Sequence, residues 1–113
     1  MHILVVEDNP LIRSATQCLL EEWGFVVECA GSVAEAVNSL DGRFSHLLCD
    51  LNLPDGTGTE VIREAKRVKR SIRAVAMTGN AALSLQNDGQ MAGADWVLTK
   101  PAAMRDLRFA LQS

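Results

Sequence analysis

The stretch ILVVEDNP, residues 3–10, sets the pattern from which the fold can be predicted. Its first four residues are continuously apolar, which is typical of a strand buried on both faces of a parallel sheet. Glu7 and Asp8 end the apolar run. Asn9 has the side chain of a helix N-cap, and Pro10 is favoured at the first helical position. A buried strand that leads directly into a helix is the first half of a βαβ unit.

The same alternation of short apolar runs and amphipathic segments continues along the 113 residues. We expect further strands at residues 25–30, 46–50, 72–77 and 96–98, and helices at residues 10–24, 32–40, 59–68, 82–92 and 102–111. Short connections between alternating strands and helices favour right-handed crossovers and a parallel sheet. The predicted fold class is α/β, with a doubly wound five-stranded parallel sheet of flavodoxin-like order 2-1-3-4-5 and helices on both faces.

Composition narrows the classes of function. The length is that of a single domain, residues 1–113, and 48% hydrophobic residues are enough to fill its core. The net charge of −3 argues against a domain that mainly neutralises nucleic-acid phosphates. No apolar run approaches the roughly 18 residues of a membrane span, and residues 1–6 lack the basic region and cleavage site of a signal peptide. We therefore expect a cytoplasmic protein without direct nucleic-acid or membrane contacts.

Cysteines and basic residues have simple structural interpretations. Cys18, Cys29 and Cys49 lack the spacing of a metal or redox motif, so we expect buried free thiols, with a redox or metal site as the alternative. Six of the eleven basic residues fall between positions 63 and 73. We interpret this cluster as the solvated face of a helix and the loop after it, and a surface for an acidic partner or nucleic acid is the alternative.

Polar and charged side chains follow four of the predicted strands. Glu7 and Asp8 follow the first strand, and Asp50 ends the third. The fourth strand is followed by Thr78-Gly79-Asn80, and the fifth by Thr99-Lys100-Pro101. In a doubly wound sheet these carboxyl ends meet at one edge, where ligands bind. We expect three carboxylates, a hydroxyl group and an ammonium group to converge there.

This set of groups suits phosphoryl chemistry. Crowded carboxylates must take up protons or bind a cation, and hard oxygen ligands favour Mg²⁺. A carboxylate in such a site can attack phosphorus, and we expect one oxygen of Asp50 to be free to do so. Lys100 would then balance charge on the phosphoryl oxygens, and the Thr78 hydroxyl and the Gly79 N–H would donate hydrogen bonds. Taken singly, each residue fits a helix start, a turn or a solvated lysine; the joint pattern favours a site.

The chain resembles the receiver domain of two-component response regulators over essentially its whole length. The resemblance rests on VVEDN at 5–9, DLNLPDGTG at 50–58, MTG at 77–79, AGAD at 92–95 and TKP at 99–101. It implies that Asp50 accepts a phosphoryl group from a histidine kinase or a histidine phosphotransfer protein. It also implies a downstream protein or output domain outside this chain, whether the chain is a stand-alone regulator or part of a larger protein.

The resemblance further implies individual roles. Glu7, Asp8, Asp50 and the backbone carbonyl of Asn52 would surround Mg²⁺. Thr78 and Lys100 would bind the phosphoryl group. Asn52 and Asn80 would tune hydrolysis, and the Lys100–Pro101 bond would be cis. Phosphorylation would shift the populations of two conformations of the face formed by the fourth helix, fifth strand and fifth helix, and this shift would pass on the signal.

The sequence departs from the family pattern near this face. Val97 replaces the usual aromatic switch residue, and its neighbour Trp96 either substitutes for that residue or packs at the edge of the sheet. Ala102 replaces a bulky aromatic residue that often follows Lys-Pro, which would loosen the last helix. Asn87-Asp88-Gly89 lies inside the helix expected at 82–92, so we predict a short or mobile helix there.

Two other classes of function share some of these features. A phosphohydrolase of the haloacid dehalogenase type also uses an aspartyl nucleophile, but it needs a second acid two residues later, where this chain has Asn52. A receiver-like binding module that is never phosphorylated is the other alternative. The intact acidic set and Lys100 argue against it, while the missing aromatic residue keeps it open.

Overall fold

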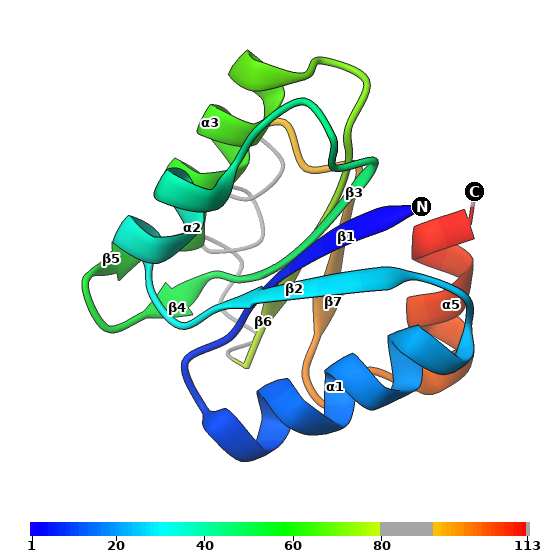
Figure 1. Cartoon of the computed structure of the whole chain (residues 1–113). Coiled ribbons are helices and arrows are strands. Elements are labelled where there is room, and N and C mark those ends of the chain that lie inside the picture. The colour runs from blue at the N-terminus through cyan, green and yellow to red at the C-terminus, as the bar shows by residue number, and fades with distance from the viewer. Residues whose placement is uncertain (80–91, 113) are drawn as a thin grey trace.

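The computed structural model describes residues 1–79 and 92–112, which form a five-stranded parallel sheet between two layers of helices (Figure 1). The strands of this sheet are β1 (His2–Val6), β2 (Val26–Ala30), β3 (His46–Asp50), β6 (Arg73–Thr78) and β7 (Trp96–Thr99). Their order is β2-β1-β3-β6-β7, and every neighbouring pair is parallel. Counted along the chain this is the order 2-1-3-4-5, so the predicted topology is confirmed.

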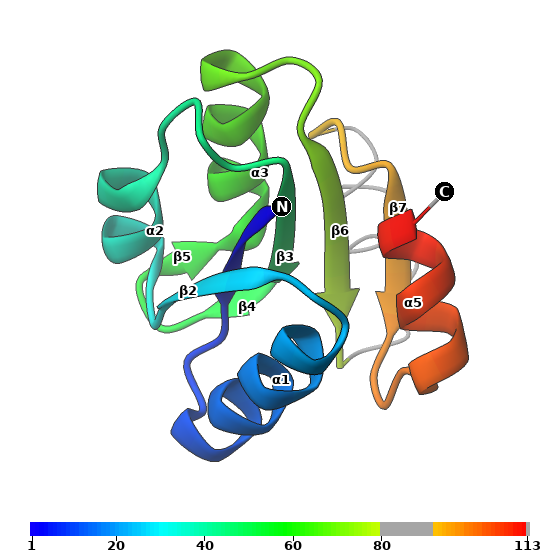
Figure 2. The ribbon, with the colours of Figure 1, turned by 45° about the vertical axis from the view of Figure 1, so that its right-hand side comes forward.

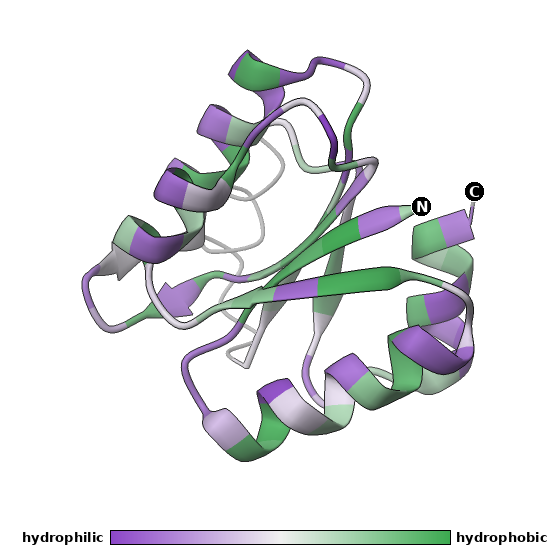
Figure 3. Ribbon diagram, in the orientation of Figure 1, coloured by the Kyte–Doolittle hydropathy of each residue, from purple (hydrophilic) through white to green (hydrophobic). Residues whose placement is uncertain are grey.

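Helices cover both faces of the sheet (Figure 2). One face carries α1 (Pro10–Glu22) and α5 (Met104–Gln112), and the other carries α2 (Val33–Ser39) and α3 (Gly58–Val68). Strand β1 supplies both layers of the core, because successive side chains of a strand point to opposite faces. Ile3 and Val5 belong to the core cluster that includes Leu107 of α5, and Leu4 belongs to the cluster that includes Ile62 of α3. Hydrophobic residues accordingly dominate the central strands in Figure 3.

Helix caps follow the sequence pattern. The Asn9 side chain accepts hydrogen bonds from the backbone N–H groups of Leu11 and Ile12, so its predicted N-cap role is confirmed. Ser32 accepts from the N–H of Glu35 at 3.1 Å. The sequence did not predict a second cap on α2. Asp55 accepts from the N–H of Val33 at 2.8 Å and of Ala34 at 3.0 Å.

The segment after β3 forms regular secondary structure. Residues 52–57 form a two-stranded hairpin, in which β4 (Asn52–Leu53) pairs with β5 (Gly56–Thr57). Strand β6 begins one residue later than expected, and α5 begins at Met104 rather than at Ala102. The helix expected at 82–92 falls almost wholly outside the described residues.

The cysteine prediction is wrong for Cys18. Cys49 is buried and Cys29 half-buried, but Cys18 is exposed on α1. The helix turns by about 100° per residue, so Cys18 points away from the side of α1 on which Leu20 is buried. None of the described helices is long and apolar enough to cross a membrane.

Two basic residues of the cluster at 63–73 make internal contacts. Lys66 donates to the carbonyl of Ile72 at 2.6 Å and pairs with Asp95 at 3.0 Å. Arg73 donates to the carbonyl of Ala110 in α5. Lys66 therefore links α3 to the segments that precede β6 and β7, and Arg73 links β6 to α5.

Candidate functional site

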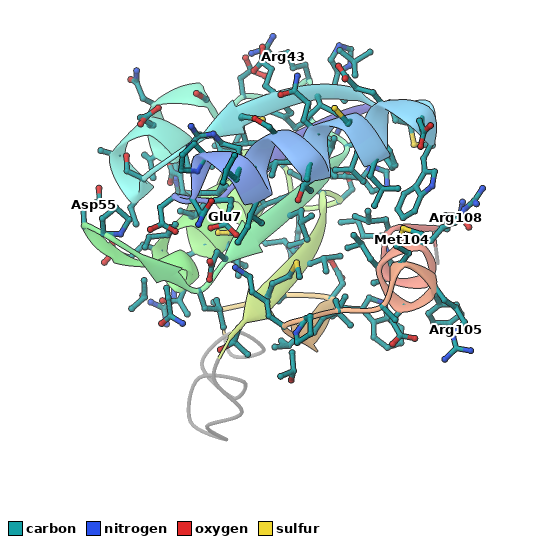
Figure 4. The ribbon with its side chains drawn as sticks, turned by 90° about the horizontal axis from the view of Figure 1, so that it is seen from below. Glu7, Arg43, Asp55, Met104, Arg105 and Arg108 are labelled. Carbon is teal, nitrogen blue, oxygen red and sulfur yellow. The ribbon has the colours of Figure 1, made fainter. Side chains whose placement is uncertain are left out.

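The predicted site residues of the described strands meet at the carboxyl edge of the sheet. Glu7 and Asp8 follow β1, Asp50 is the last residue of β3, and Thr78 is the last residue of β6. Lys100 follows β7, and its N–H donates to the carbonyl of Thr78 at 2.7 Å. The parallel register places these positions side by side. Figure 4 shows this edge from below, with Glu7 labelled.

The Lys100 ammonium group joins two acids from distant parts of the chain. Its Nζ lies 2.7 Å from Glu7 Oε1 and 2.6 Å from Asp50 Oδ2. Both acids are buried, with exposed fractions of 5% for Glu7 and 7% for Asp50. Burial by itself lowers the pKa of Lys100, but hydrogen bonds and charge from Asp50 and Glu7 outweigh it, so the pKa is raised. Lys100 therefore stays a cation.

Both oxygens of Asp50 already accept hydrogen bonds. Oδ2 accepts from Lys100, and Oδ1 accepts from the Asn52 N–H at 2.9 Å. Neither oxygen is without a hydrogen bond, because the backbone N–H two residues beyond the strand turns back toward the carboxylate. A carboxylate oxygen has two lone pairs, and Asp50 keeps a small exposed surface. The carboxylate is thus held in place while it remains able to bond to a further atom.

The acidic residues form a set of oxygen donors. Glu7, Asp8 and Asp50 each offer one carboxylate oxygen, and these oxygens all lie within 4.8 Å of one another. Three carboxylates and the ammonium of Lys100 carry a formal charge of −2, and the Arg13 guanidinium beside the carbonyl of Glu7 reduces the negative charge of this region to −1. A surplus negative charge carried by hard oxygen atoms suits Mg²⁺. Asn52, predicted to contribute its carbonyl, is held beside the cluster by its bond to Asp50.

The remaining predicted residues lie around this cluster. Thr78 is fully buried at the end of β6. Gly79 is exposed, and among the described residues no atom lies within 4 Å of a Cβ added there. Lys100 and Pro101 are joined by a cis peptide bond, as predicted. Asn80 lies outside the described residues.

The two positions near the predicted switch are packed. Val97 is half-buried against the core cluster beneath α2 and α3. Trp96 is 38% exposed and contacts Phe109 of α5 edge to face, with ring centroids 5.4 Å apart. This contact favours the interpretation of Trp96 as an aromatic residue packed at the edge of the sheet. Ala102 lines a groove of about 200 Å³ between α1 and α5, together with Leu48 and Met77.

Sequence reasoning missed two residues that support the site. Arg13 of α1 donates to the carbonyl of Glu7 at 3.0 Å, and no pattern in the sequence marks it. Gly58 opens α3 directly against the carbonyl of Asp50. It lies within the motif DGTG, but sequence alone does not show what a side chain there would meet.

Comparison with known proteins gives a consistent result. The family model for the response regulator receiver domain matches residues 3–112. The photosynthetic apparatus regulatory protein RegA of Cereibacter sphaeroides is 32% identical over 110 residues, which cover 96% of this chain and 59% of that protein. The acid tolerance regulatory protein ActR of Rhizobium meliloti is also 32% identical, with 57% of its length covered. The chain thus spans less than two thirds of these relatives.

Two solved structures resemble the whole domain. A response regulator from Burkholderia pseudomallei with a phosphorylated aspartic acid matches with a TM-score of 0.89 and 27% identity, over 99% of this chain and 66% of that one. The receiver domain of a sensor histidine kinase from Pseudomonas aeruginosa, with magnesium in its active-site cleft, matches with a TM-score of 0.87 and 30% identity. That match covers 98% of this chain and 93% of the other.

Proposed function

Because the chain belongs to the response regulator receiver domain family, we propose that Asp50 accepts a phosphoryl group from a histidine kinase or a histidine phosphotransfer protein. The observation that carries this proposal is the position of the Lys100 ammonium group between Asp50 and Glu7. A cation and a fixed carboxylate thus lie together at the edge of the sheet where ligands bind in doubly wound folds.

The acidic cluster would hold Mg²⁺ through Glu7, Asp8, Asp50 and the carbonyl of Asn52. The oxygen donor set and its surplus negative charge fit this ion. When bound, Mg²⁺ neutralises charge on the phosphoryl oxygens. The related domain from Pseudomonas aeruginosa, which has magnesium in its cleft, supports this assignment.

The side chains and backbone groups of the site act by their positions around the phosphoryl group. An Asp50 oxygen attacks phosphorus, and the bond from phosphorus to the donor imidazole nitrogen breaks, with its electron pair returning to the imidazole. Lys100 exchanges its bond to Asp50 for one to a phosphoryl oxygen, so its charge follows the transferred group. Thr78 and the Gly79 N–H donate to the other oxygens. Asn52 and Asn80 tune the later hydrolysis.

The domain acts as a signalling module rather than as an enzyme with a separate substrate. It catalyses only its own phosphorylation and dephosphorylation. The change passes to a downstream protein or output domain through the face that includes Trp96 and Val97 of β7 and helix α5. The proposed location is the cytoplasm, and the proposed partners include neither nucleic acid nor membrane.

The proposal is tested by incubation with Mg²⁺ and acetyl phosphate, followed by intact-mass measurement. We expect one phosphoryl adduct on the wild type and none on Asp50→Asn. Asp106→Asn removes an exposed carboxylate of α5 and serves as the matched control, which should label like the wild type. Equal labelling of wild type and Asp50→Asn would place the acceptor elsewhere. A wild type without any adduct would support a binding module that is never phosphorylated.

A further inference from the structure

We propose that Gly58 is a positioning residue for the acceptor carboxylate, an inference that rests on the function proposed above. Gly58 is the first residue of α3 and is buried. A Cβ atom at this position would lie 2.3 Å from the carbonyl oxygen of Asp50 and 2.9 Å from Cys49 Sγ. Carbon atoms in ordinary contact lie about 3.5–4.0 Å apart. Helix α3 can therefore approach the end of β3 this closely only without a side chain at position 58.

The close approach holds the backbone on which the site is built. The Gly58 N–H donates to the carbonyl of Leu51 at 3.0 Å, and the Leu51 N–H donates to the carbonyl of Met77 in β6 at 2.8 Å. The Cys49 thiol donates to the carbonyl of Asp50 at 3.3 Å. The peptide units from Asp50 to Leu51 are thus held by α3 on one side and by β6 on the other.

These peptide units carry the proposed chemistry. The side chain of Asp50 branches from the first of them, and the second leads into Asn52, whose N–H fixes Asp50 Oδ1. A backbone shift at Asp50 would move its carboxylate relative to the Lys100 ammonium group and to Glu7. It would also move the Asn52 carbonyl, the fourth proposed metal ligand. Gly58 therefore acts on the site through the backbone and touches none of the reacting atoms.

The requirement at Gly58 is for space rather than for an unusual backbone conformation. Gly58 is absent from the described glycines with positive φ, which are Gly24, Gly56 and Gly93. An alanine at position 58 therefore acts through the contact with Asp50. Gly42 provides a matched control, because no atom in the described part of the chain would lie within 4 Å of a Cβ added there.

The test compares Gly58→Ala with Gly42→Ala and with Leu20→Ala, which removes buried side chain on the opposite face of the sheet. Three quantities are measured on each variant of the 113-residue chain: thermal unfolding, Mg²⁺ affinity by calorimetry with the metal alone, and the rate of phosphorylation by acetyl phosphate at saturating Mg²⁺. For Gly58→Ala we expect a loss of at least tenfold in both Mg²⁺ affinity and rate. Gly42→Ala and Leu20→Ala should stay within twofold of the wild type, although Leu20→Ala unfolds at a lower temperature.

A double variant covers the case in which Gly58→Ala does not fold. Cys49→Ala makes room for the added methyl group on the sulfur side but leaves it against the carbonyl of Asp50. The double variant should bind Mg²⁺ at least tenfold more weakly than the wild type. Cys49→Ala alone, which removes only the thiol bond to the Asp50 carbonyl, should lose clearly less affinity than the double variant.

Either of two results would overturn the inference. One is a folded Gly58→Ala or double variant with unchanged Mg²⁺ affinity and rate. The other is a loss in Cys49→Ala alone as large as in the Gly58 variants, which would make core packing in general the cause. If the wild type takes up no phosphate, the proposed function fails, but the Mg²⁺ titration still tests the role of Gly58.

Discussion

Lys100 determines the charge balance of the site at the scale of single residues. Its ammonium group contacts Glu7 and Asp50, from which it is separated by 93 and 50 positions in the sequence. A buried acid is costly unless it is paired, so this one side chain makes the burial of both acids possible. The third acid, Asp8, is exposed and adds further negative charge. The three acids therefore repel one another, and a cation bound at the proposed metal site would relieve this repulsion.

Substitution of Asp8 should separate this repulsion from metal binding. In EDTA we expect Asp8→Asn to unfold at a higher temperature than the wild type, because one of the crowded charges is gone. A ligand that binds only the folded state adds about 2.7 kcal/mol at one hundred times its Kd. Mg²⁺ should therefore raise the unfolding temperature of the wild type clearly, and that of Asp8→Asn much less. An equal Mg²⁺-dependent rise in both proteins would count against Asp8 as a ligand.

His46 should make the stability of the domain depend on pH. It is buried, with Nδ1 2.7 Å from Ser45 Oγ and Nε2 2.9 Å from the carbonyl of Leu111. Burial lowers the pKa of His46 below its ordinary value of 6.5; the bond to Leu111 opposes this effect, and the charge of Arg73 adds to it. The unfolded chain thus binds a proton more readily than the folded one.

The contribution of His46 to the free energy of unfolding is therefore fully present above pH 6.5. It is lost as the pH falls from 6.5 through the lowered pKa of the folded state. Each unit of the difference corresponds to about 1.4 kcal/mol. Urea denaturation at pH 7.5 and pH 5.5 should show a smaller loss of unfolding free energy for His46→Gln than for the wild type. His2→Gln is the control and should behave like the wild type. A loss in His46→Gln as large as in the wild type would assign the effect to other groups.

At the scale of elements, the hairpin after β3 links Asp50, the proposed acceptor, to α2. Asp55 lies in the turn between β4 and β5 and is labelled in Figure 4. Its carboxylate accepts hydrogen bonds from the N–H groups of Val33 and Ala34. At the start of a helix such N–H groups have no acceptor within the helix. These bonds lower the pKa of Asp55 and keep it ionised. The loop that begins at Asp50 is thereby fastened to a neighbouring helix.

Removal of this contact should loosen α2 at its start. For Asp55→Ala we expect faster amide hydrogen exchange at Val33 and Ala34 and an unfolding temperature lower by a few degrees. Exchange in the middle of α3 should stay as in the wild type. Asp106→Ala, on α5, serves as the control and should leave α2 unchanged. Unaltered exchange at Val33 and Ala34 in Asp55→Ala would show that Ser32 alone caps this helix.

The pattern of apolar and polar residues was sufficient to predict the five-stranded sheet and the described helices α1, α2, α3 and α5, because buried parallel strands have a strong local signal. The same pattern predicted that Glu7, Asp50 and Lys100 would meet, since strand ends share one edge. The bonds of Asp55 and the tight approach of Gly58 were not predictable. Each depends on the distance between elements far apart in the sequence, which residue type alone does not specify.

At the scale of the whole molecule, we expect a single unfolding transition, because both helical layers pack on the same buried strands. Leu20→Ala should lower the free energy of unfolding by about 2–5 kcal/mol, since Leu20 is fully buried. Leu11→Ala, on the same helix but 81% exposed, should change it by at most about 0.5 kcal/mol. Urea denaturation followed by circular dichroism and by tryptophan fluorescence checks this, and the two signals should coincide. Similar losses in both variants would contradict the observed packing of α1.

Chemical mapping of the phosphorylated residue tests the central claim most directly. Borohydride reduces an aspartyl phosphate to homoserine, which can be located by peptide mass spectrometry. After phosphorylation in Mg²⁺ and reduction, we predict homoserine at position 50 of the wild type, and none when EDTA replaces Mg²⁺. Homoserine at another aspartate, or equal conversion in EDTA, would contradict a magnesium-dependent acceptor at the edge of the sheet.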